Sequence, residues 1–302
     1  MIALLRLIRL PNLVIVALTQ WLLYNRILLP AFQTQQIAPT LPPEQFYWFI
    51  VVTVLITAGG YIINDLVDIR IDLVNKPNRV IIGRRIATAT AYWFYFCINL
   101  TGFLLATYLA FVGNRVSLLF IFPTAVVGLL IYSIFLKKRP LSGNVLIALY
   151  CAGVALIVWL AEQPSLAQLS PAALTRITQL LTYYAVFAFF STLFREIIKD
   201  LEDQPGDAAN GARTLPIVWG ALAAKRLAGA SALSLLLYLV YFAYLQFASL
   251  VYSGKIALLI LMLLLLLALG LLLRAHETRH YHRLSQLTKV IMLWGILLLL
   301  FF

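Results

Sequence analysis

The amino-acid sequence predicts an all-helical protein that crosses a membrane several times. Of its 302 residues, 63% are hydrophobic and 11% are charged, whereas an ordinary soluble domain has about 25% charged residues. The apolar residues form continuous runs, and a helix needs about 20 such residues to cross the hydrocarbon core of a bilayer. Because these runs recur without a linker or a shift in composition, we expect one membrane-embedded domain over residues 1–302.

Nine apolar runs are the candidate membrane-spanning helices. The first follows Arg6 and Arg9 and carries Gln20 and Asn25, but no small-residue cleavage site follows it, so we expect a retained helix and no signal peptide. The last is long enough because the Lys289 side chain can extend to the membrane interface. The runs cover residues 13–29, 46–63, 91–112, 118–136, 144–161, 174–194, 222–250, 256–273 and 284–302.

The distribution of basic residues predicts the orientation of these spans. With the N-terminus in the cytoplasm, only four of the 23 Lys and Arg residues fall on the opposite side, namely Arg26, Arg115, Arg176 and Lys255. Cytoplasmic loops carry such an excess of Lys and Arg. The net charge of +12 therefore reflects topology and anion binding. It does not indicate a nucleic-acid partner, and nothing in the sequence indicates an obligatory protein partner.

Two acidic segments follow the second and sixth spans with the same spacing. The first motif (Asp65, Asp68, Asp72) and the second motif (Asp200, Asp203, Asp207) each place carboxylates at i, i+3 and i+7, which is one face of a helix. A single D-x-x-D is typical of a solvated helix end. Two copies on the same membrane face indicate function, because carboxylates beside hydrocarbon are costly. Four spans separate the copies, so we expect an internal parallel duplication.

Paired acidic motifs are suited to a Mg²⁺–diphosphate complex. Mg²⁺ takes one or two carboxylates and fills its remaining positions with water and substrate oxygens. All six aspartates are candidate Mg²⁺ ligands, and Asp65, Asp68, Asp200 and Asp203 are the candidate catalytic ones. Pro205 lies inside the second motif, where a proline can interrupt a helix. Candidate diphosphate contacts next to the motifs are Asn64, Arg79, Arg84, Lys137 and Lys199.

The other end of the substrate must be tolerated by the bilayer. Aromatic residues make up 13% of the chain and could line an apolar tunnel that stabilises an allylic cation. This chemistry points to a prenyl diphosphate that donates its prenyl group to a second, small or lipid-like molecule. No residue pattern identifies the general base.

With these features, the sequence resembles the UbiA superfamily of intramembrane prenyltransferases over nearly its whole length. The family's two aspartate motifs match the first and second motifs. The resemblance implies an all-helical, Mg²⁺-dependent enzyme with a central cavity open to the cytoplasm, and it places Asn12, in the segment RLPN, near the acceptor. The supporting segments are NKPNR at 75–79, Tyr132 and Ser133, Lys137 to Arg139, Gly143 and Asn144, and GARTLP at 211–216.

One position distinguishes subgroups within this resemblance. Family members that prenylate aromatic acids usually carry a Tyr four residues before the Lys of the second motif, where this chain has Arg195. The segment REIIKDLEDQPGD is similar to the enzymes that transfer geranylgeranyl to geranylgeranylglyceryl phosphate. An Arg suits a phosphate-bearing acceptor because its planar fork binds phosphate in a bidentate manner. An aromatic acceptor of the 4-hydroxybenzoate or naphthoate type remains the alternative.

Two other classes of protein share features with this sequence. The segment from His276 to His280 fits H-E-x-x-H, the helix motif of zinc proteases. It lies in a basic loop, where Arg274, Arg279 and Arg283 oppose a dication. A transporter would also have parallel repeats. Its charges are expected midway through the spans, whereas both acidic motifs lie at one face.

Overall fold

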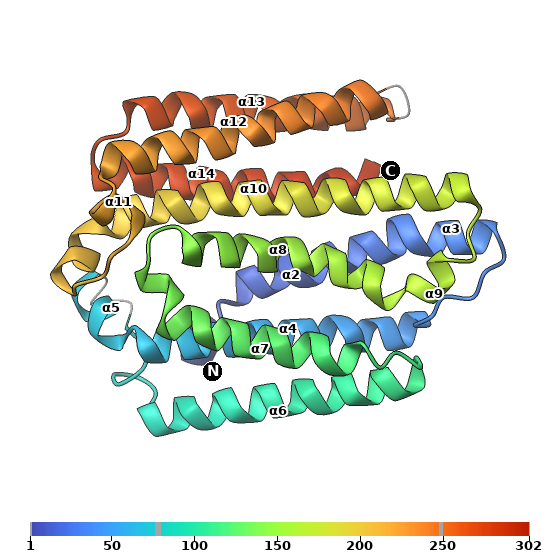
Figure 1. Cartoon of the computed structure of the whole chain (residues 1–302), viewed down its shortest axis with the longest axis horizontal. Coiled ribbons are helices and arrows are strands. Elements are labelled where there is room, and N and C mark those ends of the chain that lie inside the picture. Colours follow the sequence, from blue (N-terminus) through green and yellow to red (C-terminus); the bar gives the residue numbers. More distant parts are fainter. Residues whose placement is uncertain (1, 76–79, 248–249, 302) are drawn as a thin grey trace.

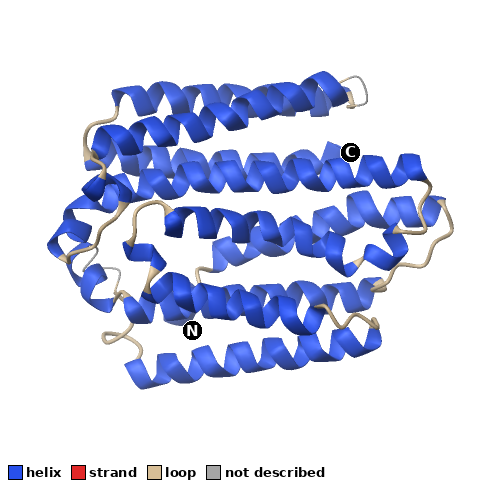
Figure 2. Cartoon of the chain, viewed as in Figure 1, coloured by secondary structure: helices blue, strands red, loops and turns tan. Residues whose placement is uncertain are grey.

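The computed structural model describes residues 2–75, 80–247 and 250–301 of the chain. Nearly all of these residues are helical, and none of those described belongs to a β-strand (Figure 2). An isolated bridge joins Ile82 and Ile86 in the turn after the first motif. The predicted fold class, an all-helical membrane protein, is confirmed.

Within the described residues, nine helices are long and apolar enough to cross a membrane, as the sequence predicts. They are α2 with η1 and α3 (Leu10–Thr34), α4 (Pro43–Val67), α6 (Thr88–Val112), α7 with η3 (Leu118–Lys138), α8 (Ser142–Ala161), α10 (Pro171–Ala209), α12 (Ala221–Gln246), α13 (Tyr252–Arg274) and α14 with η4 (Thr278–Phe301). Four short helices complete the described chain, namely α1 (Ile2–Leu7), α5 (Ile69–Asn75), α9 (Gln163–Leu166) and α11 (Leu215–Val218).

The two acidic motifs differ in backbone structure. Asp68 ends α4 with φ −90° and ψ 1°, and α5 begins at Ile69, so the first motif spans a break between two helices. The apolar pattern predicts that the sixth span ends at residue 194, but α10 continues to Ala209. Helix α10 continues beyond the apolar residues because its backbone hydrogen bonds are not interrupted before Ala209. Pro205 is exposed and does not end the helix, so all of the second motif is helical.

Helices α4 and α10 run in the same direction and end at the same end of the bundle (Figure 1). This is the arrangement that a parallel duplication requires. Helix α10 is central: it packs against α8, α12 and α14, and 61% of its most apolar 18-residue window is buried. Helix α6 lies at the edge of the bundle, with 22% of its window buried. Its exposed aromatic side chains, such as Trp93 and Phe111, therefore face the lipid.

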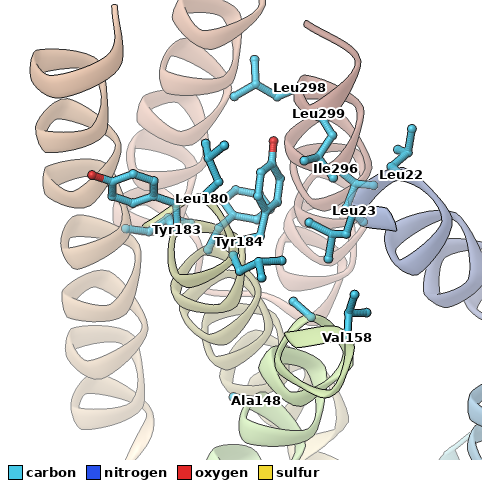
Figure 3. Close-up of a cluster of buried hydrophobic side chains, with 14 of the residues drawn as sticks. Leu22, Leu23, Ala148, Val158, Leu180, Tyr183, Tyr184, Ile296, Leu298 and Leu299 are labelled. Carbon is cyan, nitrogen blue, oxygen red and sulfur yellow. The ribbon is translucent and has the colours of Figure 1, made fainter. Parts of the chain in front are cut away.

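A buried apolar cluster joins the first and last spans to α10 (Figure 3). Side chains from four spans meet there, and close packing of this kind stabilises helix association where no water is present to drive it. Gly295 of α14 allows the closest approach, because a Cβ at this position would lie 2.0 Å from Cζ of Phe187 on α10. The labelled members are Leu22, Leu23, Ala148, Val158, Leu180, Tyr183, Tyr184, Ile296, Leu298 and Leu299.

A buried carboxylate organises the end of the bundle opposite the acidic motifs. Glu162, between α8 and α9, is fully buried. Its Oε2 accepts a hydrogen bond from the backbone N–H of Thr40 at 2.8 Å, and its Oε1 accepts one from Leu41 at 3.0 Å. Burial disfavours the charged form and raises the pKa of Glu162 to about 7, although these hydrogen bonds oppose the shift.

We expect Glu162 to make the free energy of unfolding decrease as pH rises. Its pKa is about 7 in the folded chain and near 4.5 in the unfolded chain, so the folded state binds this proton more tightly. The resulting stabilisation is complete below pH 4.5 and is lost as pH rises through 7. Its magnitude is roughly 3 kcal/mol at most.

Thermal unfolding of detergent-solubilised protein checks this expectation. Glu162→Gln cannot titrate, so the difference in melting temperature between it and the parent chain should decrease from about pH 5 to about pH 8. The variant should also be less stable than the parent at every pH, because its amide nitrogen faces a backbone N–H. A difference that does not change with pH would contradict the expectation.

Candidate active site

The two acidic motifs meet at one end of the bundle. Helix α5, which carries Asp72, packs against α10, which carries the second motif. The turn between α7 and α8 and the start of α2 reach the same end (Figure 1). Segments far apart in the sequence therefore contribute charged side chains to one region.

The N-terminal segment supplies a cation to the first motif. Arg9, before α2, has a left-handed backbone with φ 52° and ψ 53°. Its Nη2 lies 2.8 Å from Oδ1 of Asp65, and its guanidinium stacks 4.8 Å from the ring centroid of Tyr61. The Tyr61 hydroxyl accepts a hydrogen bond of 3.2 Å from Nδ2 of Asn12. Arg9 and Tyr61 are absent from the predicted site, although the segment RLPN is a signal for Arg9.

Asp68 is the most deeply buried aspartate of the first motif, with a relative exposure of 2%. Its Oδ2 accepts a hydrogen bond of 2.9 Å from Nδ2 of Asn64 and forms an ion pair with Lys137. Lys137 also donates to Oδ1 of Asn64 at 3.3 Å. The other oxygen of Asp68, Oδ1, is buried without a hydrogen-bond donor among the described residues. It is therefore a candidate ligand atom.

The second motif is held by neighbours on α8 and α14. Nδ2 of Asn144 donates to Oδ2 of Asp200 at 2.8 Å, and Nδ1 of His282 lies 2.7 Å from Oε1 of Glu202. Neither Asn144 nor His282 belongs to the site predicted from the sequence. Asn144 lies in a supporting segment of the family resemblance, whereas His282 gives no signal beyond its place in a basic loop.

Basic side chains of α10 surround a buried glutamate next to this motif. Nη1 of Arg195 lies 2.6 Å from Oε1 of Glu196. Glu196 also interacts electrostatically with Lys199, Arg9 and Lys137. Four cations therefore meet carboxylates of both motifs at this point, and this region contains two of the expected diphosphate contacts, Lys137 and Lys199, and the expected acceptor contact Arg195.

Electrostatic interactions extend from one motif to the other. Asp207 of the second motif interacts with both Asp68 and Lys137 of the first half. The phenol of Tyr132 on α7 interacts with Asp68 and Asp200. The two motifs therefore form a single electrostatic site. Tyr132 is a further residue that was not predicted to belong to the site, although it lies in a segment that supports the family resemblance.

Two expected diphosphate contacts lie in the segment after α5. Arg79 is outside the described residues. Arg84 is exposed on the turn at residues 81–86, where Gly83 has φ 84°. Asp72 borders a cavity of about 20 Å³ together with Asp65, Ile69 and residues 80–82. That volume is close to the space that one bound water requires.

The donor set fits Mg²⁺ that is completed by a substrate. Among the described residues, no three His, Cys, Asp or Glu side chains converge as a closed metal site. Mg²⁺ does not require such a site, because one or two carboxylates with water and phosphate oxygens satisfy it. The unpaired Oδ1 of Asp68 and the cavity beside Asp65 and Asp72 are positions for such oxygen ligation.

The H-E-x-x-H segment does not form the zinc-protease helix. His276 and Glu277 precede α14, which begins at Thr278, so the two histidines are not one turn apart on a helix. Glu277 forms an ion pair of 2.5 Å with Nε of Arg279. Its carboxylate is therefore held by a cation and does not face a metal.

We expect purified protein to contain no stoichiometric zinc. Elemental analysis of the parent chain and of His276→Ala should give the same low zinc content, because the motif lacks its helical geometry. Stoichiometric zinc in the parent that is lost in the variant would contradict this expectation and return the protease class to consideration.

The helical bundle and its paired acidic motifs define an integral membrane protein of the prenyltransferase class. The model of the UbiA prenyltransferase family matches residues 28–297, so the chain belongs to this family.

The chain is also similar to curated proteins from archaea. It is 34% identical to a digeranylgeranylglyceryl phosphate synthase from Methanoculleus marisnigri over 60% of this chain and 59% of that protein. It is 30% identical to one from Thermococcus kodakarensis over 77% of this chain and 76% of that protein. For four relatives, including the first, the chain spans between 55% and 66% of the relative's length.

Solved structures share the fold across almost the whole chain. One, from work on a digeranylgeranylglyceryl phosphate synthase in membranes, has a TM-score of 0.69 at 22% identity and covers 98% of this chain and 96% of its own. A UbiA homologue from Archaeoglobus fulgidus, bound to GPP and Mg²⁺, has a TM-score of 0.57 at 13% identity and covers 98% and 99%. At these identities the similarity establishes the fold.

Proposed function

We propose that this protein transfers a prenyl group from a polyprenyl diphosphate to geranylgeranylglyceryl phosphate in a Mg²⁺-dependent reaction. The observation that carries the proposal is the meeting of two acidic motifs and several basic side chains at one end of α4 and α10. The names of the archaeal relatives support the acceptor, and the ligands of the Archaeoglobus homologue support the donor and the metal for that protein.

The donor diphosphate binds between the motifs in this proposal. The residues that would hold Mg²⁺ are Asp65, Asp68, Asp200 and Asp203, with Asp72 and Asp207 in outer positions. The chemistry that bound Mg²⁺ supplies is neutralisation of the diphosphate leaving group. Lys137 and Lys199 make charge-assisted contacts to the diphosphate oxygens, with Asn64, Arg79 and Arg84 as further contacts.

The bond that breaks is the one between C1 of the allylic chain and the diphosphate oxygen, and the electron pair leaves with the diphosphate. The acceptor hydroxyl oxygen forms the new bond to C1, and its proton passes to an oxygen of the released diphosphate. The electron-rich rings of Tyr61 and Tyr132 border the site and suit the positive charge that develops on the allylic carbon. The bilayer accommodates the hydrocarbon tails of both substrates.

The acceptor phosphate binds among the cations around Glu196. Arg195, Arg9 and Lys199 carry three positive charges there, each beside a carboxylate, and would offer charge-assisted hydrogen bonds to a phosphate. Arg195 supplies the planar fork, and Asn12 supplies an amide beside the Tyr61 hydroxyl. The planar guanidinium of Arg195 favours a phosphorylated acceptor over a neutral phenol.

An assay with several acceptors tests the proposed function directly. Purified protein is incubated with Mg²⁺, labelled geranylgeranyl diphosphate and either geranylgeranylglyceryl phosphate, 4-hydroxybenzoate or a dihydroxynaphthoate, and the product is identified by mass. We expect the digeranylgeranylglyceryl phosphate ether. A prenylated aromatic acid would replace the proposed acceptor, and the absence of any Mg²⁺-dependent product would overturn the function.

We expect Asp68→Asn and Asp203→Asn each to lower kcat/KM by about 100-fold or more, because each removes one negative charge from the diphosphate–Mg²⁺ site without changing its shape. Steady-state rates and thermal unfolding are measured for both variants. Glu44→Gln, the same kind of change at an exposed position at the far end of α4, is the matched control. Either aspartate variant with the activity of this control would contradict the paired-motif site.

We expect Arg195→Tyr to raise the acceptor KM sharply, because a charge-assisted hydrogen bond contributes about 1.5–3 kcal/mol. The donor KM should change much less. A rise in the donor KM alone would instead assign Arg195 to the diphosphate and restore the aromatic acceptor as first choice. A loss of Mg²⁺ affinity alone would indicate that Arg195 orders the second motif through Glu196.

The proposed active site lies at the cytoplasmic face, with the N-terminus on that side. In a chain without its native cysteines Cys97 and Cys151, we expect a cysteine at Ser142 to react with a membrane-impermeant maleimide only from the cytoplasm. A cysteine at Gln168, at the other end of the bundle, should react only from outside. The opposite pattern would overturn the proposed orientation.

A further inference from the structure

The segment that joins α7 to the first turn of α8 contacts both acidic motifs. At its start, Lys137 binds Asp68 and Asn64 of the first half. At its end, Asn144 binds Asp200 of the second half. Lys137 and Asn144 are seven residues apart, so one short segment contacts both motifs. We call residues 136–144 the bridge segment.

The backbone of the bridge segment is held in an uncommon conformation. Leu141 has φ 64° and ψ −35°, a region that residues with a Cβ rarely adopt. The backbone N–H of Ser142 donates a hydrogen bond of 2.7 Å to the carbonyl of Pro140, which closes a three-residue γ-turn around Leu141. Such strained turns persist only where the surrounding structure determines them.

The contacts that hold this turn are at Gly143. A Cβ added at this position would lie 2.9 Å from the carbonyl oxygen of Leu136 and 3.1 Å from Cα of Lys137. Both are backbone atoms, so they cannot move aside as a flexible side chain would. Only glycine lets the first turn of α8 pack directly against the backbone that carries Lys137.

A second contact fastens the bridge segment to the region after the second motif. The backbone N–H of Arg213 donates a hydrogen bond of 3.0 Å to the carbonyl of Lys138. The segment is therefore anchored to the first motif, to the second motif and to the chain that follows the second motif.

We propose that the bridge segment fixes the separation of the two acidic motifs, and that Gly143 is the positioning residue that holds Lys137 against Asp68. This inference rests on the proposed function, because the separation of the motifs matters only if both bind the same diphosphate. Gly143 touches no substrate. It acts through the position of Lys137, which it sets by allowing the close packing of α8.

Binding of Mg²⁺–pyrophosphate, measured by isothermal titration calorimetry, tests the inference. We expect Gly143→Ala to weaken binding by about tenfold, the size of effect expected for one misplaced charge-assisted contact. The matched control is Gly153→Ala, the same substitution on the same helix, where no atom lies within 4 Å of the added Cβ. It should bind as the parent chain does.

A double variant distinguishes positioning from a general structural defect. If Gly143 acts through Lys137, then adding Gly143→Ala to Lys137→Ala should weaken binding no further than Lys137→Ala alone. Two independent, multiplying losses would overturn the inference, as would a Gly143→Ala variant that binds like Gly153→Ala.

Two further results keep the test decisive. If Gly143→Ala does not fold, one glycine inserted between the exposed residues Lys138 and Arg139 lengthens the bridge segment without touching α8. That insertion should weaken pyrophosphate binding in the same way, and unchanged binding would overturn the inference. A parent chain that does not bind Mg²⁺–pyrophosphate would overturn the proposed function itself.

Discussion

The end of the bundle that carries the two acidic motifs depends on one constraint, the pairing of buried carboxylates with cations from other segments. Asp68 is 2% exposed, and a charge removed from water to that degree is strongly destabilising unless a counter-ion accompanies it. Lys137 from the α7–α8 turn provides that charge, and Arg9 does the same for Asp65. The N-terminal segment and the bridge segment are therefore each joined by an ion pair to the acidic motif that they neutralise.

The membrane-spanning framework was predictable because the bilayer restricts the possible solutions. Each span must satisfy its own backbone hydrogen bonds, so apolar length alone predicts helices such as α4 and α12. The ends of the spans were harder to predict. Hydropathy ends with the apolar residues near Phe194, whereas the hydrogen bonds of α10 continue through the charged second motif to Ala209.

The acidic half of the candidate site could be proposed from spacing, because two motifs with the same spacing on one membrane face have few structural explanations. The contacts that complete it could not. The segments around Arg9, Tyr132 and Asn144 were recognisable, but these residues reach the motifs through the packing of α2, α7 and α8, which the order of residues does not determine. Arg195 illustrates the same limit, because its contact with the adjacent Glu196 depends on rotamers that the order of residues does not determine.

The length of α10 determines the level of the membrane at which the second motif lies. Its 39 residues extend about 58 Å, and Asp200 lies about 44 Å from its first residue, close to the full thickness of a bilayer with its headgroups. The second motif thus belongs to the layer where lipid phosphates are abundant. A site at that level is surrounded by competing phosphomonoesters and diesters. Asp68 is more deeply buried than Asp65, so its carboxylate is the less accessible of the two to those lipid phosphates.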